Sequence, residues 1–105
     1  MLNRILLDTS DPDFASAFSS KIAGQSFETL FFSINDEDFP VYTNDLALVE
    51  IDVYDKLFYQ RISRLKDKGV SIFILVSKLN KSNQIRASEA GADLVFTKAS
   101  VLKNF

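Results

Sequence analysis

Apolar residues in this chain fall into short runs separated by stretches with a helical period. The apolar-rich runs lie at 5–7, 27–32, 46–51, 72–76 and 94–96, and each has the length of a β-strand. Runs in which apolar residues do not alternate regularly with polar ones are typical of strands that are covered on both faces. We therefore predict five buried strands.

Between these runs, apolar residues recur every three or four positions, as on one face of a helix. The first such face follows Asp11 and Pro12, which are typical of a helix cap and of a first helical position. Asp55 is a candidate cap for a second helix, and Asn80 or Ser82 for a third. Phe14, Phe18 and Ile22, and then Phe58, Ile62 and Leu65, follow this period. Ile85 and Ala90 belong to the third helix, and Val101 and Leu102 begin a helix that is incomplete.

The glycines mark the junctions between these elements. Gly24, Gly69 and Gly91 each follow a helical stretch and precede an apolar run, where a left-handed residue commonly ends a helix. Residues 33–44 have no clear apolar period, and we expect a loop with one turn of helix there. Such alternation of strands and helices predicts an α/β domain with a parallel sheet and helices on both faces.

Length, charge and composition exclude several classes of function. The 105 residues suit one small domain, and a net charge of −2 gives no electrostatic basis for binding nucleic acid or an anionic membrane. The chain has no cysteine and no histidine, which excludes thiolate, imidazole and phosphohistidine chemistry. No apolar run approaches the roughly 20 residues that span a bilayer. We expect a cytoplasmic protein.

Three polar residues follow consecutive predicted strands. Glu50 lies at the end of the third strand, Ser77 after the fourth and Lys98 after the fifth. The carboxyl ends of parallel strands meet at one edge of the sheet, where ligands bind in open α/β folds. A carboxylate buried there needs a cation, and we expect Lys98 to pair with Glu50, with Ser77 as an additional donor.

The residues around these positions resemble the receiver domain of two-component response regulators. The resemblance is carried by Ser77, by the sequence Ala-Ser-Glu-Ala-Gly-Ala-Asp at 87–93, and by Thr97 and Lys98. Residues 44–50 resemble the family's third strand, and residues 4–7 with Pro12 resemble its first. The resemblance implies a flavodoxin-like three-layer sandwich with strand order 2-1-3-4-5. In this chain we expect two departures from it: a shortened second helix of the family pattern, at 33–44, and an incomplete last helix. Residues 1–105 then form a single receiver-like domain, alone or as the amino-terminal part of a longer protein.

Working receivers carry an aspartate that accepts a phosphoryl group, an acidic pair that binds Mg²⁺, a hydroxyl residue and a lysine. Here the resemblance places Glu50 at the acceptor position, and Ser77 and Lys98 match the hydroxyl and the lysine. The positions of the acidic pair hold neutral Thr9 and Ser10, flanked by Asp8 and Asp11, and no metal site is expected.

Two main hypotheses follow. The first is a degenerate receiver, not an enzyme and without a cofactor, in which a Glu50–Lys98 ion pair holds one signalling conformation and the domain acts as a regulatory protein-interaction module. The alternative is a functional receiver that a histidine kinase phosphorylates on Asp52 with Mg²⁺. Glu50 and its neighbours could also be a satisfied polar cluster with no signalling role.

The expected partners are proteins. A last helix that is incomplete leaves apolar surface beside the helix at 81–90, the fourth of a full receiver, and beside the fifth strand. Such uncovered surface is typical of a partner or homodimer contact. A small enzyme or nucleotide-binding protein has little support, because no glycine-rich phosphate loop follows any predicted strand.

Overall fold

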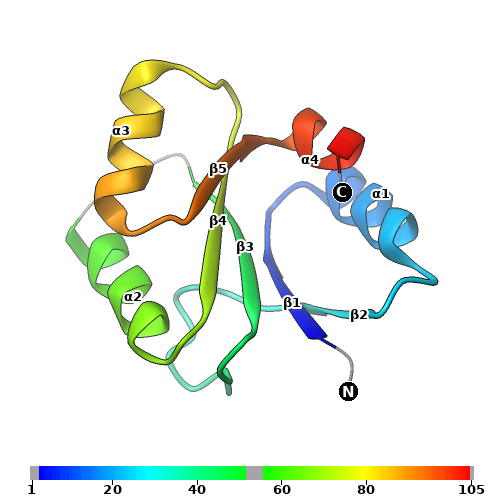
Figure 1. Ribbon diagram of the computed structural model, residues 1–105, viewed down its shortest axis with the longest axis horizontal. Helices are drawn as coiled ribbons and strands as arrows, with labels where there is room; N and C mark the ends of the chain where they lie inside the picture. The colour runs from blue at the N-terminus through cyan, green and yellow to red at the C-terminus, as the bar shows by residue number, and fades with distance from the viewer. Residues whose placement is uncertain (1–2, 52–55, 105) are drawn as a thin grey trace.

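The structure is a computed structural model that describes residues 3–51 and 56–104. Within those ranges it holds five strands and four helices (Figure 1). The strands are β1 (Asn3–Asp8), β2 (Phe27–Phe31), β3 (Leu46–Glu50), β4 (Ser71–Val76) and β5 (Leu94–Thr97). The helices are α1 (Pro12–Ile22), α2 (Lys56–Asp67), α3 (Lys81–Ala90) and α4 (Lys98–Asn104).

All the strands pair in parallel in one sheet of order β2-β1-β3-β4-β5. Figure 1 shows α1 and α4 on one face of this sheet and α2 and α3 on the other. The predicted α/β sandwich with strand order 2-1-3-4-5 is therefore confirmed. Its last helix, α4, has only 7 residues.

Two hydrophobic clusters fill the space between the three layers. Successive side chains of a strand point to opposite faces of the sheet. Leu6 accordingly packs in the cluster under α2 and α3, whereas Ile5 and Leu7 pack with Phe14 and Phe18 of α1. The α2 positions predicted to be apolar, Phe58, Ile62 and Leu65, are buried.

The helix caps follow the sequence signals where the structure describes them. Asp11 caps α1 through its side chain, which accepts a hydrogen bond from the Phe14 amide, and Pro12 is the first helical residue. Asn80 caps α3 in the same way, but the predicted cap Asp55 lies outside the described residues. Ile85 does not belong to the buried face of α3, since 47% of its surface is exposed.

The connection from β2 to β3 contains turns and no helix. The amide of Asp36 donates to the carbonyl of Ser33, and the amide of Phe39 donates to that of Asp36. These two consecutive turns stand where we expected one turn of helix. Ile34 is buried in the core, so the loop covers this part of the sheet with individual side chains.

A buried ion pair fixes the end of that loop. The guanidinium of Arg4 donates to both carboxylate oxygens of Asp45, at 3.2 and 2.9 Å, and Asp45 is only 4% exposed. The same carboxylate accepts the amide of Tyr42, and Arg4 lies over the Tyr42 ring, 4.7 Å from its centroid. This network lies at the amino edge of the sheet, opposite to the predicted site.

No helix in the described part of the chain is long and apolar enough to cross a membrane.

Candidate functional site

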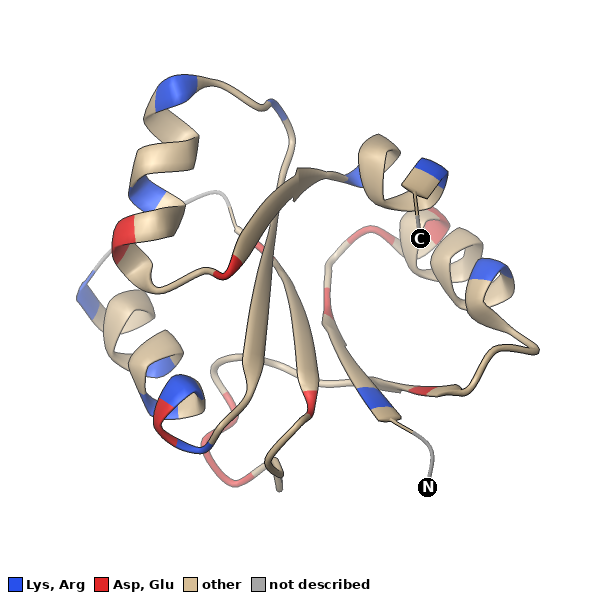
Figure 2. Cartoon of the chain, in the orientation of Figure 1, with Lys and Arg blue, Asp and Glu red and all other residues tan. Residues whose placement is uncertain are grey.

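The candidate site lies at the carboxyl edge of the sheet. Asp8, the last residue of β1, pairs with Val49 of β3, so the residues that follow β1 lie beside Glu50. Lys98 follows β5 directly and is the first residue of α4. Figure 2 shows acidic and basic segments of the chain close to this edge of the sheet.

Lys98 is held between two carboxylates. Its Nζ lies 2.6 Å from Oε2 of Glu50 and 2.9 Å from Oδ2 of Asp11. The Glu50 side chain is 12% exposed and that of Lys98 is 28% exposed. The ion pair expected between Glu50 and Lys98 is thus present. The second partner, Asp11, was expected only as a helix cap and a flanking residue.

Two hydroxyl groups satisfy the other oxygen of Glu50. Thr9 Oγ1 donates to Glu50 Oε1 at 3.2 Å, and Ser10 Oγ donates to the same oxygen at 3.4 Å. Thr9 Oγ1 also accepts the amide of Asp11, which fixes its orientation. The two positions that resemble the acidic pair of a receiver therefore serve as donors to Glu50.

The electrostatics of the site keep all three charged groups ionised at neutral pH. Burial raises the pKa of Glu50, but the hydrogen bond and charge of Lys98, together with hydrogen bonds from Thr9 and the Ser10 amide, outweigh it, and the net pKa is lowered. The hydrogen bond from Lys98 also lowers the pKa of Asp11. The bonds to Glu50 and Asp11 raise the pKa of Lys98 in turn. The two carboxylates and the ammonium of the cluster therefore stay charged in the neutral range.

Asp8 is not part of this cluster. Its Oδ2 accepts the amide of Ile34 at 2.8 Å, which ties the β2–β3 loop to the end of β1. Burial raises the pKa of Asp8, and the nearby charge of Glu50 acts in the same direction. Asp8 therefore anchors a loop and does not pair with Lys98.

Ser77 does not join the cluster either. It is exposed just after β4, and no hydrogen bond links its hydroxyl to Glu50 in the part of the chain that the structure describes. The role expected for it as a donor to Glu50 is not seen. Asp52, the alternative acceptor, lies outside the described residues.

The residues of the cluster do not fit a divalent cation. Mg²⁺ requires near-octahedral oxygen ligands, usually with one or two carboxylates. Here one ammonium engages both Glu50 and Asp11, and Thr9 and Ser10 offer only neutral hydroxyls. Among residues 3–51 and 56–104, no group of three acidic side chains is placed to hold a metal.

The cluster also joins two helices. Asp11 caps α1, and Lys98 begins α4 directly after Thr97, whose hydroxyl accepts the Ser100 amide at 3.1 Å. Val101 of α4 packs in the same hydrophobic cluster as Phe14 of α1. The Asp-Pro pair after β1 was the sequence signal for Asp11, but only the fold shows that Lys98 reaches it.

Comparisons with solved structures identify the fold. The response regulator DrrB of Thermotoga maritima, an OmpR/PhoB homologue, aligns with a TM-score of 0.76 at 18% identity over 98% of this chain and 48% of that chain. A CheY-like receiver domain protein of Methanospirillum hungatei JF-1 aligns at 0.69 with 20% identity, over 93% and 82% of the two chains. Another T. maritima response regulator aligns at 0.74 with 16% identity, over 93% and 86%.

This chain spans about half the length of DrrB. No family model and no curated protein sequence matches it. At such low identities the likeness shows the fold and nothing finer. The chain has the CheY-like receiver fold of two-component response regulators.

Proposed function

We propose that this domain is a degenerate receiver that acts as a regulatory protein-interaction module and is not switched by phosphorylation. Glu50 takes the acceptor position, and its carboxylate stays paired with Lys98. A glutamate is one methylene longer than an aspartate, so its charge extends toward the place that a phosphoryl group takes in a working receiver. The module then needs no metal and no enzymatic step.

The main support for this proposal is the ion pair between Glu50 and Lys98. The 2.6 Å ion pair between Lys98 Nζ and Glu50 Oε2 engages the cation that a phosphoryl group would need. Thr9 and Ser10 add two donors to the same carboxylate. Charge compensation by a divalent cation is normally required when an anionic carboxylate attacks an anionic phosphoryl donor. In this chain the compensating charge is already used by Glu50.

The proposed contact surface lies on α3 and β5. Leu79 before α3, Ile85 on α3 and Leu94 on β5 are 45%, 47% and 49% exposed. Apolar surface that stays exposed is typical of protein contact sites. A protein partner, such as a histidine kinase, is the proposed occupant of this face.

Amide NMR with beryllofluoride and Mg²⁺ tests the proposal. We expect the Thr9, Glu50 and Lys98 amides to stay unshifted at millimolar concentrations of both. Saturable shifts around Ser77 and Lys98 would contradict the degenerate state. Repeating the titration on Asp52→Asn would then show whether Asp52 is the acceptor, since only in that case would the shifts disappear.

A rebuilt variant gives the positive control. Thr9→Asp, Ser10→Asp and Glu50→Asp together restore the acidic residue types of a working receiver. This triple variant is expected to show saturable shifts under conditions in which the wild type shows none. If both proteins stay unshifted, circular dichroism of the variant decides whether it is folded, and a second rebuilt variant with only Ser10→Asp and Glu50→Asp repeats the comparison.

A further inference from the structure

The β2–β3 loop and the adjacent flank of α2 carry opposite charges side by side. Figure 2 shows acidic segments of this loop next to basic segments of α2. We define the charged strip as six residues of the loop and the helix: Asp36, Glu37, Asp38, Arg61, Arg64 and Lys68. The acidic three and Lys68 are exposed, and the two arginines are half-buried.

The loop docks on α2 without using its carboxylates. Arg61 Nη1 donates to the side-chain oxygen of Asn35 at 2.8 Å, and Arg64 Nη1 donates to the carbonyl of Glu37 at 3.4 Å. None of the six residues of the charged strip takes part in an ion pair within the described residues. Three anions and three cations therefore lie together on the surface without neutralising one another directly.

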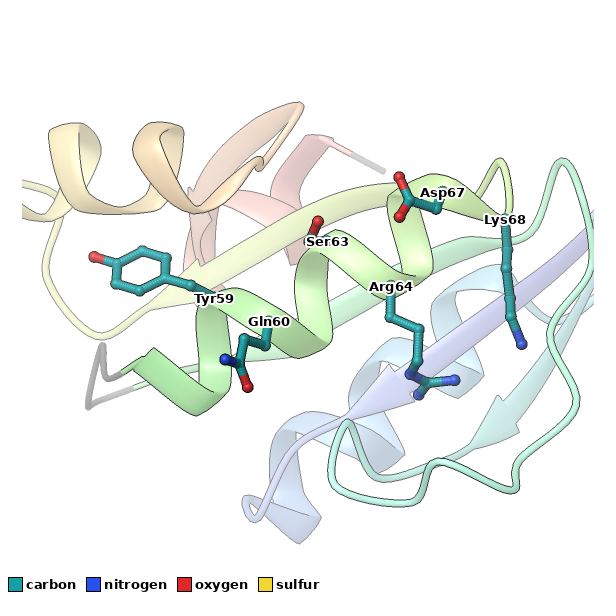
Figure 3. Close-up of a pocket in the computed structure, with 6 residues that line it drawn as sticks. All are labelled: Tyr59, Gln60, Ser63, Arg64, Asp67 and Lys68. Atoms are coloured by element: carbon teal, nitrogen blue, oxygen red, sulfur yellow. The ribbon is translucent and has the colours of Figure 1, made fainter.

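The guanidinium groups of Arg61 and Arg64 carry five donors each, and Nη1 of each donates to the loop. Their Nε atoms are buried and without a hydrogen-bond partner among the described residues, so a partner can be reached only through the terminal nitrogens. A shallow groove of about 520 Å³ follows this part of α2, lined by Tyr59, Gln60, Ser63, Arg64, Asp67 and Lys68. Figure 3 shows Arg64 and Lys68 projecting on one flank of the helix, away from Ser63 and Asp67.

We propose that the charged strip is the interface of a homodimer. A uniformly acidic or basic partner would be repelled by one half of the strip. A second copy turned by a two-fold axis instead places the acidic loop of each protomer against Arg64 and Lys68 of its partner, and does so twice. Because exposed ion pairs contribute little individually, the dimer is weak and depends on salt.

Sedimentation equilibrium of the whole chain tests this proposal. We expect the dissociation constant to rise about tenfold or more between about 25 mM and about 500 mM NaCl, because salt screens exposed charges. A wild type that stays monomeric at the lower salt concentration overturns the proposal.

Charge reversal identifies the surface. A predominantly acidic strip (Arg64→Glu with Lys68→Glu) and a predominantly basic strip (Asp36→Lys with Asp38→Lys) should each be monomeric alone. Mixed together, the two variants should form a heterodimer, a result that misfolding of either variant cannot produce. Wild-type dimerisation by either variant alone, or no association in the mixture of folded variants, overturns the proposal.

Two controls separate this interface from the proposed function. Lys78→Glu with Lys81→Glu reverses two exposed charges outside the strip and should leave the dimer unchanged. Glu50→Gln should also dimerise like the wild type, because the strip contains no residue of the Glu50–Lys98 cluster. The dimer can therefore fail while the degenerate receiver stands, and the reverse is equally true.

Discussion

Lys98 and Asp11 are 87 positions apart in the chain, yet Lys98 Nζ donates to Asp11 Oδ2 at 2.9 Å. Lys98 begins α4 and Asp11 caps α1, so one ammonium ties the starts of two helices to Glu50 at the end of β3. The cluster is therefore both the proposed functional site and a structural joint.

Replacing Lys98 by methionine should lower stability by about 1–3 kcal/mol, because Glu50 would keep its partly buried charge without a cation. Urea unfolding at pH 7 measures the change. Lys103→Met, on the exposed side of the same helix, is the matched control and should have almost no effect. Adding Glu50→Gln to Lys98→Met should recover part of the loss, because it removes the unpaired charge. A Lys98→Met protein as stable as the control would show that the pair contributes nothing.

Stability should fall as the solution is made acidic. The folded pKa of Glu50 lies below its ordinary value of 4.5, and the pKa values of Asp11 and Asp93 are also lowered. These carboxylates stabilise the fold fully above their unfolded pKa values and lose that contribution as the pH falls through the folded ones. Urea unfolding between about pH 6 and about pH 3 should show the decline, with a smaller decline in Glu50→Gln. An equally steep decline in that variant would assign the effect to other groups.

Alkaline conditions test the contribution of Lys98, the cation of the cluster, to stability. The pKa of Lys98 is raised, so its contribution is complete below its ordinary value of 10.5 and is lost as the pH rises through the folded pKa. Lys98→Met should therefore weaken the pH dependence of stability at both ends of the range.

Arg4→Met should destabilise the protein by about 3–5 kcal/mol, since it leaves Asp45 buried without its counter-ion. The Tyr42 amide, which donates to Asp45, should exchange with solvent faster in the variant. Arg86→Met removes an exposed arginine from α3 and is the matched control for urea unfolding. Equal stabilities of the two variants would mean that the Arg4–Asp45 pair does not hold the loop.

Gly91→Ala should cost more stability than Gly24→Ala. Both glycines have positive φ, at 106° and 87°, where an alanine is strained by about 1–2 kcal/mol. A Cβ at Gly91 would also lie 3.3 Å from Ile62 Cγ2, whereas one at Gly24 would meet nothing within 4 Å. Ile62 is fully buried and cannot move freely. Thermal unfolding of both variants measures the difference in stability. Equal losses of stability would show that the Ile62 side chain can move aside to accommodate the added Cβ.

Local patterns were sufficient to predict the strands and helices, because the apolar periods, the Asp11–Pro12 cap and the three glycine junctions are short-range signals. The loop at 33–44 lacks any period, so its turns and the burial of Ile34 depend on the surrounding fold. Arg4 and Asp45 are 41 positions apart and have no local signal that links them. The Glu50–Lys98 pair was predictable from strand topology, whereas the contact of Lys98 with Asp11 and the exposed position of Ser77 depend on the folded loops and were not.

The strand order has a consequence for synthesis. β2 and β3 flank β1, which leaves β3 at the centre of the sheet, and β4 and β5 then extend the β3 side in turn. A chain that emerges from the ribosome amino end first can add each new strand to an edge that already exists. Because Lys98 follows β5, its ammonium reaches Glu50 only when the last strand has docked, so the ion pair closes a domain whose sheet is already complete.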